Sequence, residues 1–270
     1  MKIDRPIFIL APARSGTTIF YNLFTRHKET AFPEHFADKY WKSPWKFKII
    51  PLMVKQQIWR YKKRPLPHEG GFWRKYHPYS KYLTEADITL QEKNYIYSAI
   101  TAQLRAFNAR RFVDRVHDFM LQIRFLNELF PDAFYIILKR EPRAVISSQY
   151  KMMTDIWSKN GVGGGNNYGR VIEKFANGGT LLETCINYYN HYIKTMEKDL
   201  FLIEDRAKTV HYEDFVKNPH YELQKLYEFT DLPWYDELKN EIPEILELTT
   251  LDKWRSLPDH EKEILERAFK

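Results

Sequence analysis

An apolar strand that leads into a short loop of small residues is the feature of this sequence that most constrains its fold. The run Ile7–Leu10 is apolar throughout and is followed by the loop Ala11–Gly16. A short apolar run of this kind is typical of a strand buried on both faces of a parallel sheet. The apolar positions beyond the loop have helical spacing and are Ile19, Phe20, Leu23 and Phe24. The pattern therefore predicts a loop at the N-terminus of a helix, where free backbone N–H groups and the helix dipole attract an anion.

The loop has the spacing of the phosphate-binding sequence G-x-x-x-x-G-K-[ST], with two replacements. Ala11 stands for the first glycine and Thr17 for the lysine. That lysine contacts the β and γ phosphates of a nucleoside triphosphate, so its absence disfavours a kinase or NTPase. Arg14 supplies a cation from the loop instead, and Gly16, Thr17 and Thr18 offer amides and hydroxyls to an anion. An ordinary strand-to-helix turn is the alternative interpretation.

A second strand with a charged end supports the anion-binding interpretation. The run Ala133–Leu138 predicts another buried strand, and a helix is expected over Ala144–Met153, with Pro142 suited to its first turn. Arg140 follows the strand, and Ser148 lies on the helix eight residues later. These two side chains can converge on one anionic group. A surface charge cluster is the alternative.

Together the two segments resemble the sulfotransferases that use 3′-phosphoadenosine 5′-phosphosulfate (PAPS) as donor. Arg14-Ser15-Gly16-Thr17-Thr18 is similar to the 5′-phosphosulfate loop in the form found in bacterial and tyrosylprotein sulfotransferases. The resemblance implies that these five residues bind the phosphosulfate. It further implies that Arg140 and Ser148 hold the 3′-phosphate, the group that distinguishes this donor from ATP.

Three later segments extend the resemblance along most of the chain. The stretch Arg111–His117 is similar to the strand that carries the family's K-T-H or K-D-P element. The stretch His211–Phe215 is similar to the segment whose tyrosine, here Tyr212, lies near the adenine. A C-terminal basic element is matched by Lys253, Trp254 and Arg255, which would also contact the donor. The R-K-G-x-x-G of the cytosolic branch is absent, which leaves the 3′-phosphate contacts at that end open.

Sulfuryl transfer needs a base for the acceptor and cations for the leaving phosphate. Arg14 is the expected cation, and Arg115 would be a second one unless it pairs with Asp114 or Asp118. Two residues are candidates for the base. His117 matches the histidine of K-T-H, whereas Glu34 lies where the R-S-G-T-T branch keeps a glutamate, with His35 beside it. We favour His117, because an imidazole titrates near neutrality, and expect Glu34 to orient the acceptor or the imidazole.

These motifs predict one α/β domain over residues 1–270 with a P-loop-like parallel β-sheet flanked by helices, as in the sulfotransferase fold. The expected strands are Ile7–Leu10, Thr30–Phe32, Phe112–Val113, Phe134–Leu138 and Thr209–His211. Residues 36–83 are rich in aromatic and basic side chains and read as a helical insertion, either a substrate cap, a partner or membrane surface, or helices that pack their aromatics inward. The glycine-rich stretch Gly161–Gly169 is expected to hinge a mobile loop.

Composition is consistent with a soluble enzyme. The net charge of +7 suits an anionic ligand, and no nucleic-acid-binding motif accompanies it. The single cysteine, Cys185, excludes an internal disulfide, and no signal peptide or membrane span is evident, so a cytoplasmic location is expected. The predicted function is transfer of a sulfuryl group from PAPS to a hydroxyl, or less readily an amine, of a small-molecule acceptor, with PAP as product and without a metal. A nucleotide kinase or NTPase and a non-enzymatic nucleotide-binding adaptor are the alternatives.

Overall fold

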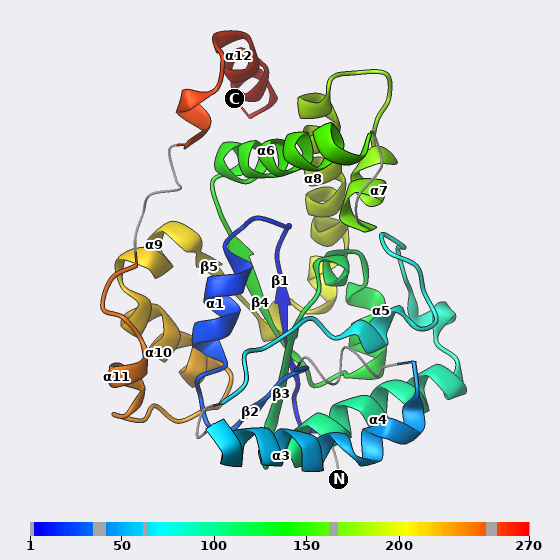
Figure 1. Cartoon of the computed structure of the whole chain (residues 1–270), viewed down its shortest axis with the longest axis vertical. Helices are drawn as coiled ribbons and strands as arrows, with labels where there is room; N and C mark the ends of the chain where they lie inside the picture. Colours follow the sequence, from blue (N-terminus) through cyan, green and yellow to red (C-terminus); the bar gives the residue numbers. More distant parts are fainter. Residues whose placement is uncertain (1–2, 35–41, 62–63, 162–166, 247–252, 270) are drawn as a thin grey trace.

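A central parallel sheet organises the molecule (Figure 1). The computed structural model describes residues 3–34, 42–61, 64–161, 167–246 and 253–269. The sheet has five strands in the order β2-β3-β1-β4-β5, and every neighbouring pair is parallel. The strands are β1 (Ile7–Leu10), β2 (Thr30–Ala31), β3 (Arg111–Arg115), β4 (Phe134–Lys139) and β5 (Ala207–His211). The predicted α/β class with a parallel sheet is therefore confirmed.

Strand β3 is longer than the sequence predicted because its apolar centre is flanked by polar residues that are buried or partly buried. Arg111 is fully buried and donates hydrogen bonds to Asp4 and Asp231. Asp114 is also fully buried and accepts hydrogen bonds from the Trp73 indole and from the backbone of Arg115. Buried polar groups of this kind are tolerated when they are paired. Local hydrophobicity therefore detected only the centre of the strand.

Helices cover both faces of the sheet (Figure 1). They are α1 (Thr17–Phe24), α3 (Ile50–Tyr61), α4 (Leu90–Phe107), α5 (Ile123–Leu129), α6 (Pro142–Asn160), α7 (Asn167–Glu173), α8 (Leu181–Asp199), α9 (Tyr212–Lys217), α10 (Pro219–Phe229), α11 (Leu238–Glu241) and α12 (Asp259–Ala268). Alternate residues of β1 point to opposite faces. Phe8 and Leu10 join a core with α4, α5, α6 and α8, whereas Ile7 and Ile9 join a second core with α1, α9 and α10.

The strand order reverses about β1, since β2 and β3 lie on one side of it and β4 and β5 on the other. In open parallel sheets the ligand crevice lies outside the carboxyl ends of the strands at such a point. The segments that follow β1, β3 and β4 all leave the sheet at this edge. They are the segments in which the sequence placed the candidate anion-binding and catalytic residues.

The predicted insertion, residues 36–83, packs most of its described large side chains inward. Phe47, Phe72 and Trp73 are buried in the core with α4, while Trp45 is 65% exposed. Three of the aromatic side chains that the structure describes in this segment therefore pack inward, in line with one of the interpretations offered by the sequence, and its role as an insertion stays a prediction. Most of the glycine-rich stretch, residues 162–166, lies outside the described residues, so its predicted hinge stays a prediction.

The C-terminal helix α12 lies beside α6 and α8, far along the chain from both (Figure 1). Leu265 is fully buried in the larger core, and the Tyr150 hydroxyl of α6 donates a hydrogen bond of 2.6 Å to Glu261. The preceding 3-10 turn, Lys253–Ser256, packs on α6. These contacts place the end of the chain over the helix that carries Ser148.

Candidate active site

In the loop after β1, Gly16 has a backbone conformation that favours glycine. Gly16 adopts a φ of +85°, and a Cβ at this position would overlap the ring of Tyr212. Both facts favour glycine at this position. The Ser15 hydroxyl is buried behind the loop and has no hydrogen-bond partner within the described protein. The loop thus directs the N-terminus of α1 toward the edge of the sheet, with a buried donor still unused.

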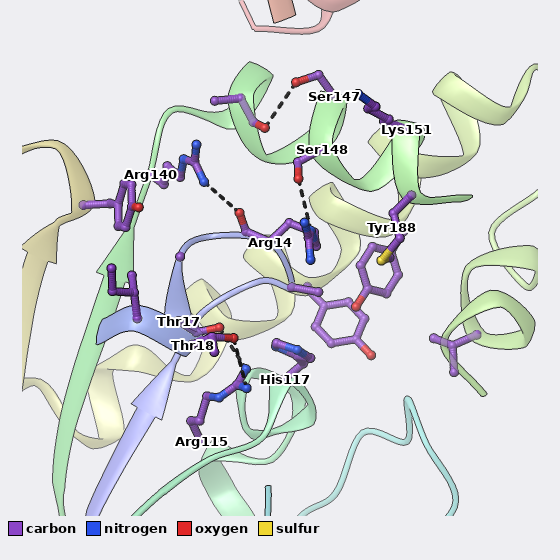
Figure 2. Close-up of a pocket in the computed structure, with 18 of the residues that line it drawn as sticks. Arg14, Thr17, Thr18, Arg115, His117, Arg140, Ser147, Ser148, Lys151 and Tyr188 are labelled. Carbon is purple, nitrogen blue, oxygen red and sulfur yellow. Dashed lines mark hydrogen bonds between the residues drawn. The ribbon is translucent and has the colours of Figure 1, made fainter. Parts of the chain in front are cut away.

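The two anion-binding segments predicted from the sequence meet in space (Figure 2). Arg140, at the end of β4, donates a hydrogen bond of 3.1 Å from its guanidinium to the carbonyl oxygen of Arg14. The Arg14 Nε in turn donates to the Ser148 Oγ of α6 over 3.1 Å. The Arg140 guanidinium also lies 4.7 Å from the centre of the Tyr212 ring. Residues from four segments therefore converge on one polar surface.

Arg115 reaches from the end of β3 to the start of α1 (Figure 2). Its guanidinium donates to the Thr17 hydroxyl over 2.9 Å and to the Thr18 hydroxyl over 3.3 Å. It also forms an ion pair with Glu69 at 3.3 Å. The alternative from the sequence, an ion pair of Arg115 with Asp114 or Asp118, is thus not what the described structure contains. The cation is instead held against the phosphate-loop hydroxyls.

His117 follows Arg115 and faces the same cavity. Its Nδ1 lies 3.4 Å from the carbonyl oxygen of Ala11, and its Nε2 lies 3.6 Å from the Glu69 carboxylate. A proton on Nδ1, directed at Ala11, leaves the lone pair on Nε2. Burial lowers the pKa of His117 below its ordinary value of 6.5, although Glu69 opposes this effect. The imidazole is therefore neutral and able to accept a proton at pH 7.

One large cavity contains these groups. Its volume is about 1250 Å³, which leaves room for a nucleotide and a second ligand. The predicted residues that line it are Arg14, Gly16, Thr17, Thr18, Arg115, His117, Arg140, Ser148 and Tyr212. Ile19, although apolar, also lines it and is 36% exposed. The physical reason is that this side of the helix faces the cavity, while Phe20 and Phe24 face the core.

Other predicted site residues lie away from the cavity wall. Glu34 is 1% exposed and does not line the cavity. Trp254 is buried beneath the Arg143 guanidinium, which lies 4.5 Å from its ring, and Arg255 lies beside the same ring. The side chain of Lys253 and the whole of His35 lie outside the described part of the chain. Donor contacts from this C-terminal element therefore stay a prediction, although Ser256 and Leu257 just beyond it do line the cavity.

Several lining residues were not found from the sequence. Glu69 and Arg74 come from the aromatic-basic segment, and Lys151 comes from α6. Lys151 falls one helical turn after Ser148, and that spacing could have identified it. Glu69 had no comparable signal, since nothing local indicates that residues 65–74 return to β3.

The buried carboxyl of Asp114 holds residues 69–73 close to β3. Asp114 accepts hydrogen bonds of 2.7 Å from both the Trp73 indole and the Arg115 amide, and the Gly70 amide also donates to it. A Cβ on Gly70 would collide with the Asp114 carboxyl. The close approach of residues 69–73 to β3 therefore depends on a glycine at this position. Burial raises the pKa of Asp114 to about 7, with the hydrogen bonds opposing the rise.

Replacing Asp114 with asparagine is expected to change how stability depends on pH. Between pH 4 and 7 the folded protein retains a proton that the unfolded chain releases, so wild-type stability falls as pH rises through this window. The variant lacks this titration. Relative to wild type it should gain up to about 1.4 kcal/mol per pH unit, in addition to any constant loss from altered hydrogen bonds. Urea unfolding of both proteins at pH 5 and pH 7 measures the difference, and parallel stability profiles would contradict the assignment.

No helix in the described ranges has the length and apolar character needed to cross a bilayer. Within the same ranges, no cluster of three or more histidine, cysteine or acidic side chains has the arrangement of a metal site.

The parallel sheet, the loop at the N-terminus of α1 and the convergent cations define a P-loop-like α/β protein with a site for an anionic ligand. The chain belongs to the sulfotransferase family, whose model matches residues 6–236.

Similar proteins agree with this membership. The chain is 22% identical over 236 residues to protein-tyrosine sulfotransferase A of Caenorhabditis elegans, covering 86% of this chain and 51% of that protein. It is 23% identical over 234 residues to a Drosophila melanogaster protein-tyrosine sulfotransferase, covering 85% of this chain and 38% of that protein. The chain thus spans about half or less of the length of these relatives.

Solved structures share the fold. The sulfotransferase domain from the curacin biosynthetic pathway superimposes with a TM-score of 0.55 at 17% identity, covering 99% of this chain and 98% of that one. Sulfotransferase STF9 from Mycobacterium avium gives a TM-score of 0.60 at 14% identity, covering 99% and 76%. The predicted sulfotransferase fold is confirmed.

Proposed function

We propose that this protein transfers a sulfuryl group from PAPS to a hydroxyl of a small-molecule acceptor, and less readily to an amine. The observation that carries the proposal is the chain of contacts from Arg140 through Arg14 to Ser148 beside a phosphate loop that lacks the lysine of NTPases. An anion that bears both a 5′ and a 3′ phosphoryl group matches cations placed on two sides of one loop. A nucleoside triphosphate has no group for the second side.

The residues present fit the proposed donor. The Ser15 hydroxyl is buried and unpaired within the described protein, and the N-terminus of α1 faces the cavity. Gly16, Thr17 and Thr18 would hold the 5′-phosphosulfate together with Arg14 and Arg115. Arg140 and Ser148 would hold the 3′-phosphate, with Tyr212 near the adenine. When bound, the donor supplies an activated sulfuryl group and a phosphate leaving group.

Protein groups account for the remaining requirements. His117 is neutral at pH 7, and its Nε2 accepts the acceptor proton as general base. Arg115, held at the Thr17 and Thr18 hydroxyls, offsets negative charge that grows at the loop. Arg14, from the loop after β1, provides a second positive charge in the same cavity (Figure 2).

The acceptor is proposed to be a metabolite or natural product, in a protein that acts in the cytoplasm. The region beyond His117 is lined by Tyr79, Tyr188 and Tyr192, and Arg74 stacks on Tyr79 at 4.2 Å. Tyr79 and Arg74 belong to residues 36–83, which supports the proposed role of that segment as a substrate cap. The names of the curated relatives make a tyrosine-containing peptide the natural comparison in an acceptor screen.

Selective stabilisation by PAP is the expected result that tests the donor. At a hundredfold excess over its dissociation constant, a ligand stabilises the folded state by about 2.7 kcal/mol. For a chain of this size that corresponds to a rise of roughly 5–10 °C in melting temperature. PAP should produce this shift, while AMP, ATP and adenosine 5′-phosphosulfate at equal concentration should produce much less.

Equal shifts with PAP and AMP would contradict the 3′-phosphate site, and a larger shift with ATP would favour the kinase alternative. Labelled PAPS incubated with fractionated metabolites then tests transfer. Binding of PAP without transfer to any fraction or peptide would favour the nucleotide-binding adaptor.

A further inference from the structure

We propose that Glu69 is the positioning residue of the site: it holds Arg115 against the phosphate loop and supports the protonated form of His117. The inference rests on the proposed function, because it assigns His117 the role of base. It identifies an acidic group of the site in a segment that the sequence predicts to be an insertion. It also differs from the sequence prediction, which gave this role to Glu34.

The Glu69 carboxylate contacts three groups that differ in function. Its Oε1 lies 3.3 Å from the Arg115 guanidinium and 3.6 Å from Nε2 of His117. Its Oε2 accepts a hydrogen bond of 2.9 Å from Arg74. Arg115 is the cation that donates to Thr17 and Thr18. One carboxylate therefore links the candidate base to the cation at the phosphate loop.

The backbone around Glu69 is fixed by β3 itself. Gly70 and Trp73 both donate to the buried Asp114 carboxyl, which precedes Arg115 in the strand. The Glu69 side chain is 22% exposed, and that of His117 is 23% exposed, so both reach the cavity from a rigid support. A carboxylate anchored in this way pays little conformational entropy to keep its contacts.

The groups around Glu69 keep its carboxyl ionised. Burial raises its pKa, but His117, Arg115 and Arg74 outweigh that effect and hold the pKa below its usual value. The groups that face His117 are Glu69 from this segment, Arg115 from β3, Asp118 from the turn after β3 and Arg14 across the cavity. When the acceptor O–H proton moves to Nε2, the new imidazolium has the Glu69 carboxylate beside it. Loss of this carboxylate should therefore weaken His117 as a base.

The Glu69→Gln variant separates this role from a structural one. Glutamine keeps an oxygen that can accept from Arg74 but removes the charge. We expect the pKa of His117, followed by NMR titration of the imidazole in the presence of PAP, to fall by about one unit or more. We expect kcat to fall about tenfold to hundredfold, with the acid limb of its pH profile displaced to lower pH. Glu69→Asp, which retains the charge, should recover part of both effects.

Glu85→Gln is the matched control. Glu85 also pairs with an arginine, Arg124, at 2.9 Å, but it is exposed and does not line the cavity. This variant should leave the His117 titration and kcat unchanged. The His117 signal is identified among the 9 histidines by its loss in His117→Ala.

A Glu69→Gln protein whose His117 titration and kcat both match wild type would overturn the proposal. A fall in kcat with an unchanged His117 titration, and no recovery in Glu69→Asp, would also overturn it, since that result indicates only altered packing. If no acceptor is sulfated even by wild type, the proposed function fails. The NMR titration still decides whether Glu69 acts on His117.

Discussion

Turnover of the His117→Ala variant is expected to be about a hundredfold to ten-thousandfold lower than that of wild type, the usual cost of losing a general base. The structure supports this expectation because Nε2 of His117 faces the cavity and burial keeps the imidazole neutral at pH 7. Affinity for PAP should stay nearly intact, since His117 contacts Ala11 and Glu69 and not the Arg140–Arg14–Ser148 group. Steady-state kinetics with saturating donor, together with PAP titration by calorimetry, measures both quantities.

Two controls make this prediction specific. His191→Ala removes an exposed histidine that does not line the cavity and should leave turnover unchanged. Glu34→Gln removes the other candidate base from the sequence, which lies buried and away from the cavity wall. An active His117→Ala enzyme beside an inactive Glu34→Gln enzyme would reverse the assignment of the base.

Loss of Arg14 or of Arg140 should be nearly as damaging as loss of His117. The two variants should differ in whether turnover or PAP affinity is the main quantity that falls. Arg14→Ala is expected to lower kcat by about a hundredfold to a thousandfold, because a preorganised charge that stabilises the transition state is removed. Arg140→Ala is expected to weaken PAP binding by about tenfold to a hundredfold and to erase the preference for PAP over AMP. Its hydrogen bond to the Arg14 carbonyl means that some loss of turnover should accompany the loss of affinity.

Arg143→Ala provides the comparison for both variants. Arg143 lies three residues beyond Arg140, but its guanidinium pairs with Glu141 and stacks on Trp254 outside the cavity. The Arg143→Ala variant should bind PAP and turn over substrate at close to wild-type levels. An Arg140→Ala protein that still discriminates fully between PAP and AMP would contradict the assignment of the 3′-phosphate site.

The sequence predicted best the strands whose own residues are apolar throughout. Ile7–Leu10 is apolar at every position and forms β1 with the predicted bounds. The strand predicted at Phe112–Val113 extends in the structure to Arg111 and Arg115. These polar ends are stabilised by partners that lie far away in sequence, such as Asp231 for Arg111. Residue pattern alone has no access to such partners.

Helix α6 shows the same distinction. Its start was predicted from Pro142, since proline suits the first turn of a helix. Its end at Asn160 lies beyond the predicted Met153, and Ile156 and Trp157 of this extension pack partly buried against the larger core. Tertiary contacts extended a helix whose later residues carry a weaker local signal.

The sequence by itself determined the parallel α/β class, and it predicted an anion-binding loop and a shared site for Arg140 and Ser148, because these depend on short segments with fixed local geometry. Only the tertiary structure decided which carboxylate enters the site. Glu34 lies just after β2, yet it is buried away from the cavity. Glu69 reaches Arg115 and His117 because Gly70 and Trp73 bind the buried Asp114 across more than forty residues of chain. Such a long-range contact is selected by the free energy of the whole fold, and no local pattern of residues encodes it.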